Sequence, residues 1–165
     1  MRLIYLLSVF MHILAAAAWL GGAFFIIIML VPSIRKNKFR QTGSALMKDI
    51  GPRLRTTAWI SFLILLLTGI FNFIYRFGTD SIVSVSFWQT SVGTALAVKL
   101  VLVLAIVLIS LYHDFAVGPA ASTAMMNDPM SKESQALRRK ASLCGRLNTI
   151  LGLMAVFAAV IIVRG

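Results

Sequence analysis

The sequence has few charged residues, and almost none of them are acidic. Its 165 residues include five Asp or Glu against 16 Lys or Arg, and charged residues make up 13% of the chain. Soluble domains average about 25% charged residues, so this composition, with 59% hydrophobic residues, excludes an ordinary soluble fold. The surplus of basic charge does not indicate a nucleic-acid partner, because most basic residues lie between long apolar runs.

Cysteine and the common catalytic motifs are equally scarce. Cys144 is the single cysteine of the sequence, which excludes an internal disulfide and a metal site built from thiolates alone. No GxGxxG, P-loop, HExxH, GxSxG or CxxC pattern is present. The sequence therefore gives no case for a nucleotide-binding enzyme, a hydrolase or a thiol redox protein.

Long apolar runs are what the sequence does contain. The first, Leu3 to Val31, has no Asp, Glu, Lys or Arg, and about 20 apolar helical residues cross a bilayer core about 30 Å thick. It exceeds the roughly 7 to 15 apolar residues of a signal peptide, so we interpret it as an uncleaved span. The predicted fold is an all-α, four-helix transmembrane bundle in a single membrane domain over residues 1–165, with helices at about 3–31, 56–75, 93–115 and 143–163.

Two basic segments, residues 32–55 and 116–142, are expected to be loops between the spans. Twelve of the 16 Lys and Arg lie in these segments or next to them, so the positive-inside rule places both loops in the cytoplasm. Both termini then lie on the outer side of an inner (plasma) membrane, and anionic lipids are expected partners of the loops. Gly118-Pro119 is expected to end the third helix. Each pair of spans meets a proline before its basic loop, Pro32 or Pro119, which indicates a duplicated helical pair.

Polar side chains within the spans predict a site, because ionisable groups are expensive to place at membrane depth. A rise of about 1.5 Å per residue puts His12 about 13 Å and Lys99 about 9 Å from the outer edge. The returning spans bring Thr68 and Met154 to the same level, with Met11 and Asn72 nearer the edge or on a neighbouring face. We therefore expect a polar layer in the outer half of the bilayer. His113, about 30 Å from that edge, belongs at the opposite surface.

Three interpretations of this layer remain open from the residues alone. A haem would need His12 as an axial imidazole and a flat slot, and Ala15, Ala16 and Trp19 share the helix face of His12. Copper would use imidazole and thioether ligands, which His12, Met11 and Met154 supply. In the third interpretation, His12 simply hydrogen-bonds a backbone carbonyl or Thr68, and the small residues allow close helix packing.

Several short motifs resemble the membrane domain of the copper-resistance protein D (CopD) family. They are His12 with Ala17-Ala18-Trp19-Leu20-Gly21-Gly22 and Leu30-Val31-Pro32, then Arg53-Leu54 and Leu67-Thr68-Gly69, Gly93 with Lys99-Leu100, and Leu137-Arg138-Arg139. This resemblance implies copper handling or transport, with His12 and also Met11 and Met154 as metal ligands. It further implies a partner on the periplasmic side that delivers copper or exchanges electrons.

A more distant similarity is to the four-helix, haem-binding bacterial membrane protoporphyrinogen oxidase. Its first-helix His and third-helix Lys fall on His12 and Lys99, and its later Tyr-His falls on Tyr112-His113. This similarity implies a haem b-binding, cytochrome b-like redox protein as the alternative function, and a haem-dependent membrane oxidoreductase if the protein is an enzyme. A cofactor-free structural or assembly subunit is the second alternative. The sequence leaves homo- or hetero-oligomers open.

Overall fold

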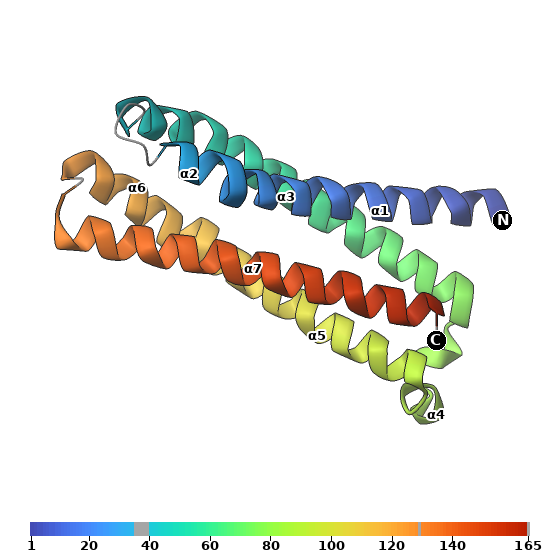
Figure 1. Cartoon of the computed structure of the whole chain (residues 1–165). Coiled ribbons are helices and arrows are strands. Elements are labelled where there is room, and N and C mark those ends of the chain that lie inside the picture. The colour runs from blue at the N-terminus through green and yellow to red at the C-terminus, as the bar shows by residue number, and fades with distance from the viewer. Residues whose placement is uncertain (35–39, 129, 165) are drawn as a thin grey trace. The chain divides into compact units, whose positions relative to one another are not determined.

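The computed structural model describes residues 1–34, 40–128 and 130–164, and helices occupy most of these ranges (Figure 1). In chain order the elements are α1 (Arg2–Phe24), the π-helix η1 (Phe25–Leu30), α2 (Val31–Ile34), α3 (Arg40–Phe77), the 3-10 turn η3 (Asp80–Ile82), α4 (Val85–Trp88), α5 (Ser91–Tyr112), the π-helix η4 (His113–Val117), α6 (Gly118–Asn127) and α7 (Lys132–Arg164). No strand occurs among the described residues. The all-α prediction is confirmed.

The chain divides into two compact units, which we call unit 1 (Met1–Phe87) and unit 2 (Trp88–Gly165). In unit 1, α1 packs along α3, and in unit 2, α5 packs along α7. Four helical stretches are long and apolar enough to cross a membrane: Arg2–Ser33, Asp49–Phe77, Ser91–Asn127 and Lys132–Arg164. The prediction of four spanning helices is confirmed, whereas the single domain and the sides of the termini stay predictions.

The spanning helices expose large apolar side chains and bury small ones. Leu66 and Phe157 are 60% and 67% exposed, whereas Ala15 and Ala158 are each 5% exposed. A soluble protein rarely exposes so much contiguous apolar surface. In a bilayer, lipid tails cover large apolar side chains at no cost, and small residues let two helix backbones approach closely. The packing within each unit is therefore that of membrane helices.

The expected end of the third helix at Gly118-Pro119 is wrong. The chain continues through the proline as α6, which ends at Asn127. Proline ends a helix because it donates no N–H and its ring clashes with the preceding turn. Here the π-helix η4 comes directly before it, and the N–H of Gly118 bonds the carbonyl of His113, five residues back. This wider turn accommodates the proline without ending the helix.

Unit 1 uses the same arrangement. The N–H of Val31 bonds the carbonyl of Ile26, five residues back, directly before Pro32. The following connection is also more helical than expected, because α3 begins at Arg40 and includes Pro52. A π-turn that ends directly before a proline in both units agrees with the duplicated helical pair indicated by the sequence.

Candidate functional site

His12 lies on the face of α1 that packs against α3. Its ring is part-buried, and its Nδ1 is 2.8 Å from the hydroxyl oxygen of Thr68. The Cε1 atom of the same ring faces Gly69, where an added Cβ would lie 3.5 Å away. Thr68 was one of the partners that the sequence proposed for His12, and the contact joins two residues 56 positions apart in the chain. The imidazole is thus held between two spans of unit 1.

The hydrogen bonds of the Thr68 hydroxyl indicate which nitrogen of His12 carries the proton. The Thr68 hydroxyl donates its one hydrogen to the carbonyl of Ile64, one turn back on α3. Its lone pairs then remain for the contact with His12, which favours the tautomer in which Nδ1–H donates to Thr68. In that tautomer the lone pair of the imidazole is on Nε2. A metal-binding histidine normally has this arrangement, with one nitrogen donating to a fixed acceptor and the other directed to the metal.

The face of α1 beyond His12 is covered by α3. Ala15, one turn further along α1, is 5% exposed, and the ring of Trp19 packs on that of Phe62 with their centroids 5.2 Å apart. These are residues that the sequence proposed as the slot for a haem. In unit 1 the small side chains allow α1 and α3 to pack closely. The Trp19–Phe62 ring pair lies two turns further along α1 than the His12–Thr68 contact.

Met11 lies beside His12 in the sequence but on another side of the helix. Consecutive helical residues point about 100° apart, and the Met11 side chain is 43% exposed. The contacts of unit 1 thus bring Thr68 to His12, and the placement of Met11 next to that pair stays a prediction.

Lys99 and Met154, the other proposed site residues, belong to unit 2. Lys99 lies on α5 and is half-buried. Met154 lies on α7, is 50% exposed, and lines a shallow apolar groove between these helices with Ala95, Val98 and Phe157 among its neighbours. Among the described residues that line this groove, Met154 is the one with a sulfur atom, and none has an imidazole or a carboxylate.

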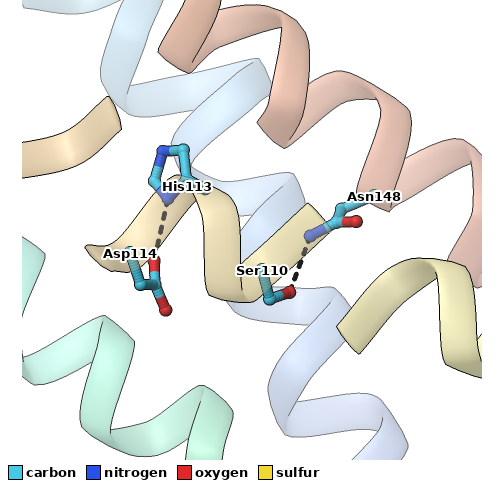
Figure 2. A network of polar contacts seen from close by, with 4 residues as sticks. All are labelled: Ser110, His113, Asp114 and Asn148. Carbon is cyan, nitrogen blue, oxygen red and sulfur yellow. Dashed lines mark hydrogen bonds and ion pairs between the residues drawn. The ribbon is translucent and has the colours of Figure 1, made fainter. Parts of the chain in front are cut away.

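Unit 2 has a polar group of its own near the π-helix η4 (Figure 2). The side-chain amide of Asn148 on α7 donates to the hydroxyl of Ser110 on α5 at 2.8 Å, and Nδ1 of His113 lies 2.8 Å from Oδ1 of Asp114. Asp114 is the more buried of that pair, with 14% of its side chain exposed against 36% for His113. Ser110 and Asn148 were missed from the sequence because single polar residues on two helices give no shared pattern.

The described residues contain no group of three or more His, Cys, Asp and Glu side chains that could hold a metal ion. A metal bound at His12 would therefore have this imidazole as its anchor, supported by Thr68. Sequence reasoning also missed Ser8, one turn before His12 on α1, whose hydroxyl oxygen is buried. Its spacing of four residues from His12 was the available signal.

Comparison with known proteins gives a family assignment. No curated protein and no solved structure matches the chain. The family model for copper resistance protein D matches residues 48–162, which includes Thr68, Lys99 and Met154 and begins after His12. This match extends over more than half of the 165 residues. The chain therefore belongs to the copper resistance protein D family.

Proposed function

We propose that the protein binds copper as cargo inside the membrane and passes it on, with Nε2 of His12 as the ligand that first holds the ion. The observation that carries this proposal is the hydrogen bond from His12 to Thr68. With the proton on Nδ1, the lone pair of the imidazole is on Nε2, the nitrogen that we propose as the ligand. Thr68 acts as the orienting partner, as hydrogen-bonding groups behind a ligand do at metal sites.

Copper chemistry suits this arrangement. Thioether is a soft ligand that selects Cu(I), and imidazole is a common ligand of copper. Neither ligand is charged when it binds the ion, which avoids the cost of placing a charged side chain at membrane depth. Met11 in unit 1 and Met154 in unit 2 are each proposed as a thioether ligand for copper within its own unit, and replacing each with Leu tests its share of the binding. The membership in the copper resistance protein D family, whose model matches residues 48–162, supports the same cargo.

A titration with Cu(I) tests the proposal. The purified protein competes for Cu(I) with a coloured chelator, beside the His12→Ala and Ile13→Ala variants. Ile13 is the matched control, because it is the next residue on α1 and is 60% exposed. We expect wild type and Ile13→Ala to bind equally and His12→Ala to bind far more weakly. Equal binding by all three proteins would overturn the assignment of His12.

The same samples separate copper from the other two functions. An absorbance spectrum recorded oxidised and dithionite-reduced would show a Soret band and sharp reduced bands if the protein is a haem b-binding redox protein. Such bands, lost in His12→Ala, would replace the copper proposal. A colourless protein that ignores copper would instead indicate a structural or assembly subunit.

A further inference from the structure

Two contacts show which residues of α1 and α3 lie side by side. The rings of Tyr5 and Tyr75 stack with their centroids 4.4 Å apart, and His12 bonds Thr68. His12 lies seven positions after Tyr5 on α1, and Thr68 lies seven positions before Tyr75 on α3, as two antiparallel helices require. Ser8 lies four residues before His12, and Asn72 lies four residues after Thr68. Residues four apart share a helix face, so Ser8 and Asn72 face the same level of the helix pair.

Both residues bring a buried polar atom to that level. Within the described part of the chain, the Ser8 hydroxyl oxygen and Oδ1 of Asn72 are buried and have no hydrogen-bond partner. Hydroxyls in membrane helices usually bond the carbonyl one turn back, as Thr68 does with Ile64 and Thr149 does with Gly145. The Ser8 hydroxyl does not use this bond. Leaving such an atom unpaired costs about 1 to 3 kcal/mol.

The two atoms are complementary in chemistry, since a hydroxyl donates and an amide oxygen accepts, yet they do not bond each other. Buried polar groups that are not paired directly are normally paired through ordered water, which needs two to four polar partners. One turn further along the helix pair lie His12 and Thr68, which are bonded to each other. The level of Ser8 and Asn72 is therefore polar. It lies between the Tyr5–Tyr75 ring pair on one side and the His12–Thr68 contact on the other.

We infer that Ser8 and Asn72 hold water between α1 and α3, and that this hydrated level connects the Tyr5–Tyr75 end of unit 1 with His12. A cation arriving from that end meets the water held by Ser8 and Asn72, and stays hydrated there, before it meets the imidazole. The role of this level as the copper route rests on the proposed function. The hydration itself does not.

Cysteine labelling in open membrane fragments tests the hydration. Ser8→Cys and Asn72→Cys are made in a Cys144→Ser background, which removes the native buried thiol, and are treated with a charged, water-soluble thiosulfonate reagent. Leu7→Cys and Ile70→Cys are matched controls, because these side chains lie at nearby depths and are 55% and 52% exposed on the apolar surface. Thr79→Cys, in the connection after α3, is the positive control, and its labelling defines complete reaction.

We expect the Ser8→Cys and Asn72→Cys variants to react and both matched controls to stay unlabelled, since thiolates form in water and not in lipid. Labelling of the controls as fast as these two variants, or no labelling of the two variants, would overturn the inference. Either variant alone carries the test if the other fails to fold. Labelling does not involve copper, so a hydrated level in a protein that binds no copper would refute the proposed function alone.

A second variant tests the route. Replacing both polar groups, Ser8→Ala with Asn72→Leu, removes the partners of the water while leaving His12 and Thr68 in place. We expect slower loading with Cu(I) in stopped-flow mixing, while the equilibrium affinity stays that of wild type. Loading at the wild-type rate would show that copper reaches His12 by another way.

Discussion

Replacing Thr68 by Val should weaken copper binding without unfolding the protein. Valine has nearly the shape of threonine, so the packing of α3 against α1 is kept, and the change removes only the acceptor for the Nδ1 proton of His12. The ring then also populates the tautomer with its proton on Nε2, which cannot bind a metal through that atom. The variant therefore separates the orientation of His12 from its presence.

The magnitude follows from two effects. Loss of an orienting partner typically lowers metal affinity about 10- to 100-fold, which corresponds to about 1.4 to 2.7 kcal/mol. The same hydrogen bond contributes only about 0.6 kcal/mol on average to the stability of a membrane protein, and at most about 1.7 kcal/mol. We thus expect a large loss of affinity beside a small loss of stability.

The assay is a chelator competition for Cu(I) combined with a thermal unfolding curve of each purified protein. Thr68→Ser keeps the hydroxyl and should bind nearly as wild type, and Leu67→Val changes a neighbouring side chain that is 60% exposed. Wild-type affinity in Thr68→Val would refute the argument from the tautomer. Weakened binding in Thr68→Ser as well would show that packing, and not the hydrogen bond, is responsible.

Three further outcomes follow from the fold. Gly118→Ala should lower stability by about 1 to 3 kcal/mol in an unfolding assay, because the new Cβ would lie 3.0 Å from the carbonyl oxygen of His113, whereas Gly145→Ala meets nothing within 4 Å and should be neutral or stabilising. Tyr75→Ala should cost about 0.5 to 1.5 kcal/mol beyond the lost burial, because it removes the stack on Tyr5, and Tyr75→Phe should keep that stability. A reporter that is active only outside the cytoplasm should be active when fused to the C-terminus, and inactivity would overturn the predicted orientation.

The fold followed from the sequence where one physical effect dominates. Unbroken apolar runs such as Leu3 to Val31 leave a helix as the one structure whose backbone is satisfied in lipid, so the four spans were predictable. The helix ends were not, because the rule that proline ends a helix competes with the π-turn before Pro119. The residue types from His113 to Val117 do not predict that turn.

The site was predictable only in part, for a similar reason. Depth along a helix follows from counting residues, and it brought His12 and Thr68 to one level, where the structure places a hydrogen bond. The spacing of four residues places Ser8 on the helix face of His12, but a lone serine in an apolar span does not predict that its hydroxyl is buried without a partner. The count also grouped Met154 with His12; the described contacts of Met154 are those of an apolar groove in unit 2, and the grouping stays a prediction.

X-ray absorption of the Cu(I)-loaded protein tests the central claim most directly, because it reports the ligands of the bound ion. We predict the multiple-scattering signal of a coordinated imidazole in wild type and in Ile13→Ala, and its loss in His12→Ala at equal copper content. A wild-type spectrum without an imidazole signal, or an unchanged spectrum in His12→Ala, would contradict the account.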